Sequence, residues 1–78
     1  MNKKLRGLDS RKVERILKKA GFEVKRQAGS HQQFVGMVKG QLRLVTVVAK
    51  QKHFTPKTLK KMISQSGLSE EEWLEALK

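Results

Sequence analysis

The segment from Arg26 to Phe34, RQAGSHQQF, combines residue types that suit phosphodiester chemistry. His31 supplies an imidazole, the side chain that gains and loses a proton nearest to neutral pH. Gly29 and Ser30 directly before it offer a tight turn, unhindered backbone amides and a small hydroxyl. An imidazole held there can take the proton of a ribose 2′-hydroxyl, so that the alkoxide attacks the adjacent phosphate. DNA lacks that hydroxyl, and such a site would select RNA.

A second interpretation of the same residues involves no catalysis. His31 can simply begin a strand and hydrogen-bond a phosphate or a backbone carbonyl. The other histidine, His53, precedes a helix start in a lysine-rich loop and is interpreted as a solvated residue or a phosphate contact. The two histidines lack the local spacing of a metal site, and the chain has no cysteine. Glycine signatures for dinucleotides and phosphate loops are also absent, so we expect neither metal nor cofactor.

The chain is strongly basic, with 18 Lys and Arg against 7 Asp and Glu and a formal net charge of +11 in 78 residues. Such an excess predicts a polyanionic partner, and RNA is the one that the His31 chemistry favours. A run of lysines is often only a solvated surface, and each lysine taken singly fits that interpretation as well. The candidate RNA contacts are Lys25, Arg26, Gly29, Ser30, Lys50 and Lys52.

The elements that must position these residues follow from local signals. Apolar residues recur at helical spacing after Asp9, which can cap the helix, and Gly21 ends it. Three segments rich in β-branched residues follow, at 22–28, 31–38 and 41–49, and the pairs Gly29-Ser30 and Lys39-Gly40 separate them. The third segment is the most continuously apolar, and we expect it to be the most completely covered strand. The residues of the apolar helix face are Val13, Ile16, Leu17 and Ala20.

Two further helices are predicted after the strands. Thr55-Pro56 is a strong helix start and Gly67 a stop, while Ser69 and Glu72 form a capping box for a third helix. The order α-β-β-β-α-α predicts an α+β fold, a two-layer structure with a three-stranded antiparallel sheet and helices on one face. Residues 1–78 are expected to form a single domain, since a second core would leave each half too little apolar surface.

The aromatic residues fall at or beside these apolar positions, which favours packing in the core over stacking on bases. They are Phe22, Phe34, Phe54 and Trp73. No run approaches the roughly 20 apolar residues of a membrane-spanning helix. No hydrophobic stretch follows the basic N-terminus, so we expect a cytoplasmic protein without membrane contact.

Taken together, the segments VERILKKAGFEVKRQAGSHQQF, VTVVAK and TPKTLKKMISQSGLSEEEWLEAL resemble the HicA family, the small RNA-cleaving toxins of type II toxin-antitoxin systems. The resemblance runs over nearly the whole chain and includes an R-x-x-G-S-H block at Arg26 to His31. Gln32 stands where the family often has a second histidine, and Lys50 where it frequently has another.

This resemblance implies a fold like the double-stranded RNA-binding domain and cleavage of mRNA independently of the ribosome. It further implies His31 as the catalytic residue, Gly29 and Ser30 as its positioning turn, and an antitoxin of the HicB type that blocks the site. Two other functions remain open from the residues. One is an RNA-binding module that never cuts, and the other is a basic protein that mainly binds an acidic polypeptide.

Overall fold

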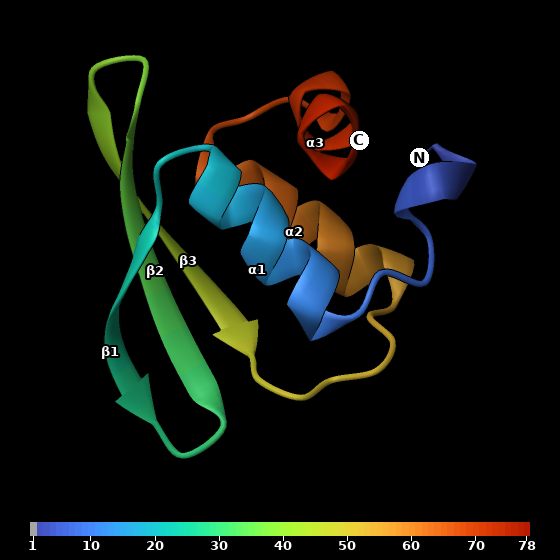
Figure 1. Cartoon of the computed structure of the whole chain (residues 1–78), viewed down its shortest axis with the longest axis horizontal. Coiled ribbons are helices and arrows are strands. Elements are labelled where there is room, and N and C mark those ends of the chain that lie inside the picture. Colours follow the sequence, from blue (N-terminus) through green and yellow to red (C-terminus); the bar gives the residue numbers. More distant parts are fainter. Residues whose placement is uncertain (1) are drawn as a thin grey trace.

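The computed structural model describes residues 2–78 and contains one antiparallel three-stranded sheet and three α-helices (Figure 1). A short 3-10 helix at Lys3–Leu5, which the sequence analysis did not predict, precedes them. The predicted α+β order is confirmed. The elements are α1 (Ser10–Lys19), β1 (Glu23–Ala28), β2 (His31–Val38), β3 (Gln41–Val48), α2 (Pro56–Ser66) and α3 (Glu70–Leu77).

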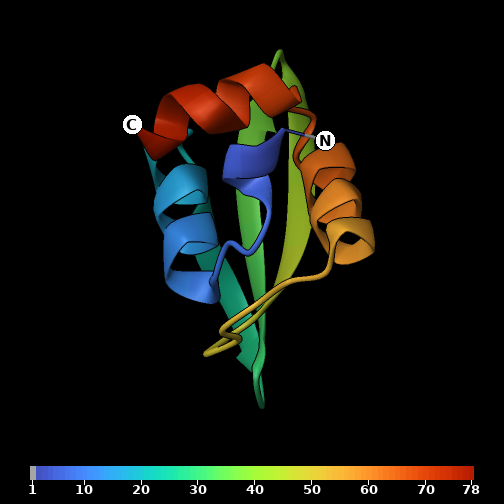
Figure 2. The ribbon, with the colours of Figure 1, turned by 90° about the vertical axis from the view of Figure 1, so that its right-hand side faces the viewer.

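The helices form one layer and the sheet the other. Figure 2 shows α1 and α2 in front of the sheet, on either side of the N-terminal segment, with α3 lying across one end. Within residues 2–78, no helix covers the opposite face of the sheet, which we call the open face. No helix in this part of the chain is both long and apolar enough to span a membrane.

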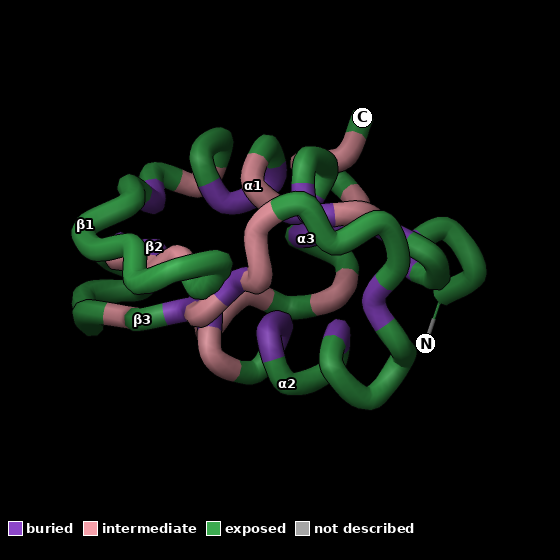
Figure 3. The backbone as a smooth tube through the Cα atoms, turned by 90° about the horizontal axis from the view of Figure 1, so that it is seen from below, coloured by how far each residue is buried: buried purple, intermediate pink, exposed green. Residues whose placement is uncertain are grey.

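The core lies between the sheet and the helices. Buried positions lie on the sides of α1 and α2 that face the interior (Figure 3). In β2, Phe34, Gly36 and Val38 are buried, so the even-numbered residues face the helices and the odd-numbered ones the open face. The buried apolar residues are Leu5, Leu8, Val13, Ile16, Leu17, Phe22, Phe34, Val38, Val45, Val47, Phe54, Leu59, Met62, Ile63 and Trp73.

Side-chain caps begin the helices where the sequence predicts them. Asp9 accepts a hydrogen bond of 2.9 Å from the backbone N–H of Lys12. Thr55 caps α2 ahead of Pro56. Each cap satisfies a backbone N–H that has no partner within the helix, and the helix starts are therefore fixed locally.

The strand order is β1-β2-β3, so β3 is an edge strand. The expectation that 41–49 would be the most completely covered strand is wrong, because β2 occupies the centre. Leu42 is 70% exposed and Leu44 48%, since alternation places both on the open face. The turn from β2 to β3 has positive φ angles at Lys39 (51°) and Gly40 (80°), as a two-residue hairpin requires.

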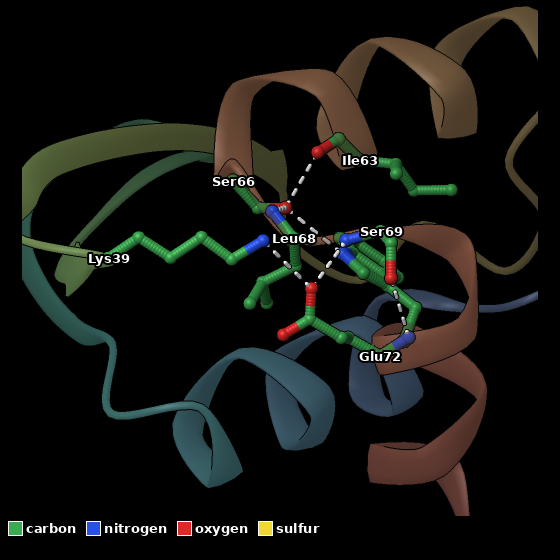
Figure 4. Close-up of polar contacts among 7 residues, drawn as sticks. Lys39, Ile63, Ser66, Leu68, Ser69 and Glu72 are labelled. Carbon is green, nitrogen blue, oxygen red and sulfur yellow. Dashed lines mark hydrogen bonds and ion pairs between the residues drawn. The ribbon is translucent and has the colours of Figure 1, made fainter.

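Polar contacts at the start of α3 involve Ser69, Glu72 and Lys39 (Figure 4). The Glu72 carboxylate accepts a bond of 3.0 Å from the backbone N–H of Ser69 and lies 3.5 Å from Lys39 Nζ. The bond from Ser69 and the nearby ammonium of Lys39 hold the pKa of Glu72 below its ordinary value of 4.5. The predicted capping box at Ser69 and Glu72 is confirmed, and the ion pair of Glu72 with Lys39 links α3 to the β2–β3 hairpin.

Candidate functional site

The β1–β2 hairpin places His31 at the end of the sheet. Gly29 has a φ of +60°, a conformation that glycine adopts without strain, and the two-residue turn Gly29-Ser30 leads directly into β2. His31 is the first residue of β2 and lies between Ala28 of β1 and Val48 of β3. Its side chain is exposed and, by alternation with the buried Phe34, belongs to the open face. The imidazole is therefore accessible to a large substrate.

Arg26 shares the open face with His31 because β1 contains a bulge. Val24 pairs with Phe34, and an unbroken register would next pair Arg26 with Gln32, whose side chain belongs to the covered face. The register shifts between Val24 and Arg26, so that Arg26 pairs with Gln33 instead. This one-residue shift moves a guanidinium onto the face that carries the imidazole. Arg26 is predicted as an RNA contact, but no pattern in the sequence predicts the bulge.

Lys25 is the extra residue of that bulge. It is exposed, and its Nζ atom lies 3.4 Å from Glu23 Oε2. This ion pair is solvent-exposed on both sides, so it contributes little stability and does not commit the lysine to a fixed position. Lys25 thus remains accessible beside Arg26.

Lys50 and Lys52 lie at the same end of the sheet but on its other side. The backbone N–H of Ala49 donates a bond of 2.6 Å to the carbonyl of Ser30, which holds the chain after β3 beside the hairpin turn. Lys50 follows with a φ of +62°, and both lysines line a surface pocket that borders α1. The predicted basic residues therefore flank the hairpin turn from two faces and do not form one groove.

His53 lies in the loop between β3 and α2 and is exposed. A Cβ atom at Gly7 would lie 3.5 Å from its Nδ1 atom, so the ring packs close to the N-terminal segment. Within residues 2–78, no group of three or more histidine and acidic side chains is arranged to hold a metal ion. As a second exposed histidine away from the β1–β2 turn, His53 is a matched control for His31.

The composition of the hairpin end suits an anionic ligand. Four of the seven acids lie on α3, namely Glu70, Glu71, Glu72 and Glu75, whereas Asp9 and Glu14 border the pocket that Lys50 and Lys52 line. The side chains of Arg26, Lys50 and Lys52 are all exposed around the turn. Exposed cations of this kind attract phosphates at long range, and the attraction weakens as salt rises.

A comparison with protein-family models finds a match over most of the chain. The model described as "HicA toxin of bacterial toxin-antitoxin" matches residues 10–68, from the start of α1 through the end of α2. The matched region includes the bulged strand β1, the Gly29-Ser30 turn and His31. A search of curated proteins finds no match.

Proposed function

The chain belongs to the HicA family of toxins from bacterial toxin-antitoxin systems, and from this premise we propose that it is a metal-independent endoribonuclease that cleaves mRNA. His31 is the general acid/base of this reaction. The observation that carries the proposal is the placement of an exposed imidazole and a guanidinium, those of His31 and Arg26, on one open sheet face beside a small-residue turn.

The chemistry requires only groups that the chain supplies. The His31 imidazole removes the proton of a ribose 2′-hydroxyl, the 2′-oxygen bonds to phosphorus, and the bond from phosphorus to the 5′-oxygen breaks. The departing 5′-oxygen takes up a proton from solvent, which leaves a 2′,3′-cyclic phosphate and a 5′-hydroxyl. Arg26 and Lys25 stabilise the charge on the phosphoryl oxygens. Gly29 and Ser30 keep the turn small, so that a polynucleotide can approach it.

A toxin of this class has an antitoxin partner, and we propose that a HicB-like protein covers the open face. Met37, Leu42 and Leu44 are exposed apolar residues on the same face as His31. An apolar strip beside a basic site suits a partner that combines apolar and acidic side chains. A protein seated on that strip would also exclude RNA from His31.

The test compares two exposed histidines. His31→Ala should abolish RNA cleavage by the purified protein and growth arrest on expression, while His53→Ala should retain both. Cleavage should persist in EDTA, leave cyclic phosphate ends, and stop when the substrate carries 2′-deoxyribose at the cut site. Cleavage by the His31→Ala variant at the wild-type rate would falsify the assignment.

The alternative function is an RNA-binding module of the same fold. An open basic face can hold structured RNA through phosphates and 2′-hydroxyls without cutting it. Salt-sensitive RNA binding by a wild-type protein that never cleaves would favour this alternative. Tight binding to an acidic protein with little affinity for RNA would favour the third possibility, a basic structural partner.

A further inference from the structure

A pocket of about 500 Å³ lies on the covered side of the hairpin end, between the start of α1, the β1–β2 strands and the loop after β3. It is separate from the open face that carries His31. Its exposed cations are Arg11, Lys50 and Lys52, while two amide side chains, Gln27 and Gln32, line it from the sheet. The proposed cleavage mechanism uses neither amide.

One hydrogen-bond acceptor of these two glutamine side chains, the Oε1 atom of Gln32, has no donor among residues 2–78. Gln27 donates from Nε2 to the carbonyl of Gly29 at 3.2 Å, so its Oε1 atom faces Gln32 and accepts from Gln32 Nε2 at 3.4 Å. This chain of bonds fixes the orientation of the Gln32 amide. Gln32 Oε1 is buried and has no hydrogen-bond partner among residues 2–78. An acceptor of this kind gains a hydrogen bond when a water molecule or a ligand in the pocket supplies the donor.

Other acceptors border the same pocket. Glu14 contributes a carboxylate, and Asp9 another, one oxygen of which caps α1 by accepting from Lys12. The pocket thus offers oxygen acceptors together with exposed cations. A nucleotide matches this combination, because its phosphate is anionic and the bases of A, C and G carry an exocyclic amino group that donates. Uracil carries no such group.

We propose that this pocket binds one nucleotide of the RNA substrate through an exocyclic amino group of its base. On binding, the half-buried side chain of Gln32 turns toward the pocket, so that its Oε1 atom accepts from that amino group, and Lys50 and Arg11 contact the phosphate. This inference rests on the proposed ribonuclease function for its biological role, but the binding itself does not require cleavage.

The pocket lies next to the cleavage site along the chain. Gln32 directly follows His31, and their side chains belong to opposite faces of β2. Only the turn Gly29-Ser30 separates the two faces at this end. The space beside Gly29 is open, since a Cβ atom added there would meet no other atom within 4 Å. An RNA strand that crosses this turn presents a phosphate to His31 and a neighbouring base to Gln32. The pocket would then set a sequence preference beside the cut.

The binding test uses the full-length His31→Ala protein, labelled with ¹⁵N and titrated with AMP, CMP, GMP, UMP and inorganic phosphate. We expect at least one of the amino-bearing nucleotides to shift the side-chain amide signals of Gln27 and Gln32. It should bind about tenfold tighter than UMP, the ratio expected for about one hydrogen bond. Equal binding of UMP or inorganic phosphate, or no binding at all, overturns the proposal.

The functional test maps cut sites on a random RNA pool by sequencing RNA ends. Gln32→Ala should lose the base preference next to the cut, whereas Gln41→Ala, an exposed glutamine at the start of β3, should keep it. An unchanged preference in Gln32→Ala overturns the proposal. If the wild-type protein cuts no RNA, the ribonuclease function fails, and the titration of the His31→Ala protein still decides whether the pocket binds a nucleotide.

Discussion

The indole N–H of Trp73 donates a hydrogen bond of 3.0 Å to the hydroxyl oxygen of Ser66, and both side chains are fully buried. The same hydroxyl donates to the carbonyl of Ile63 at 2.7 Å and accepts from the backbone N–H of Leu68 at 3.1 Å. Figure 4 shows the bonds from Ser66 to Ile63 and Leu68 where α2 ends and α3 approaches. A single serine thus satisfies the polar groups that arise where α3 packs into the core.

Ser66→Ala should therefore destabilise the fold by about 1–3 kcal/mol, because it leaves the buried N–H of Trp73 without an acceptor. Ser64→Ala, on the exposed side of the same helix, is the matched control and should change stability by less than about 0.5 kcal/mol. Urea denaturation followed by Trp73 fluorescence measures both. Equal stability of the two variants would contradict the role given to the Ser66 hydroxyl.

Gly36→Ala should destabilise the fold by about 1–3 kcal/mol through overpacking. A Cβ atom at this position would lie 2.7 Å from Cγ of Phe22, whose ring covers the glycine. Phe22→Ala removes Cγ, Cδ1 and Cδ2, the three ring atoms that the new Cβ would meet, so the double variant should be more stable than the sum of the two single effects predicts. Strict additivity would show that the clash with Phe22 is not the cause.

Glu72→Gln should reduce stability in a pH-dependent way. The folded-state pKa of Glu72 lies below its ordinary value of 4.5. The ionised carboxylate therefore stabilises the fold above pH 4.5, and this stabilisation is lost as the pH falls through the lower folded-state pKa. The difference between wild type and Glu72→Gln in free energy of unfolding should accordingly shrink on acidification.

The control for this measurement is Glu71→Gln, which removes a charge from the same first turn of α3 without removing the ion pair to Lys39. Its effect measures the interaction of a carboxylate with the helix N-terminus alone. If the free energy of unfolding depends on pH in the same way for Glu72→Gln and Glu71→Gln, then neither the bond to Ser69 nor the charge of Lys39 contributes to stability.

Arg26→Gln should slow RNA cleavage by about 10- to 100-fold, the loss expected for one charge-assisted hydrogen bond to a phosphate. The salt dependence of RNA binding should also become less steep. Arg6→Gln, an exposed arginine in the N-terminal segment, is the control that separates a local contact from the loss of one charge. Equal effects of the two substitutions would mean that Arg26 acts only through the net charge of the protein and makes no specific contact with the phosphate.

Leu42→Asp should weaken the complex with the antitoxin by about tenfold or more, because it places a charge in the centre of the proposed apolar contact. The control is Gln41→Asp, which adds the same charge at the neighbouring position. Gln41 pairs with Val38, whose side chain belongs to the covered face, so the added charge lies outside the apolar strip. Titration calorimetry with the partner encoded by the adjacent gene compares them. An undisturbed complex with Leu42→Asp would place the antitoxin on another surface.

The predicted helices and strands agree with the structure because their signals are local. Asp9, Thr55 and Ser69 each satisfy backbone groups within three residues, and the turn at Lys39-Gly40 requires only the positive φ angles found there. The burial of Phe22, Phe34, Phe54 and Trp73 also followed from their positions in apolar patterns. His31 could be named for the same reason, since a histidine after Gly-Ser is visible in one short segment.

The amino-acid sequence by itself determined the order of elements, the apolar face of α1, the burial of the aromatic residues, the strong positive charge and the candidate imidazole. Only the tertiary structure decided that Arg26 shares a face with His31, that β3 is an edge strand with Leu42 exposed, and that Lys50 lies with Gln32 beside α1. Each of these depends on which strand pairs with which and in what register. Pairing is set by contacts between residues distant in the chain, and a bulge of one residue reverses the face of every side chain beyond it.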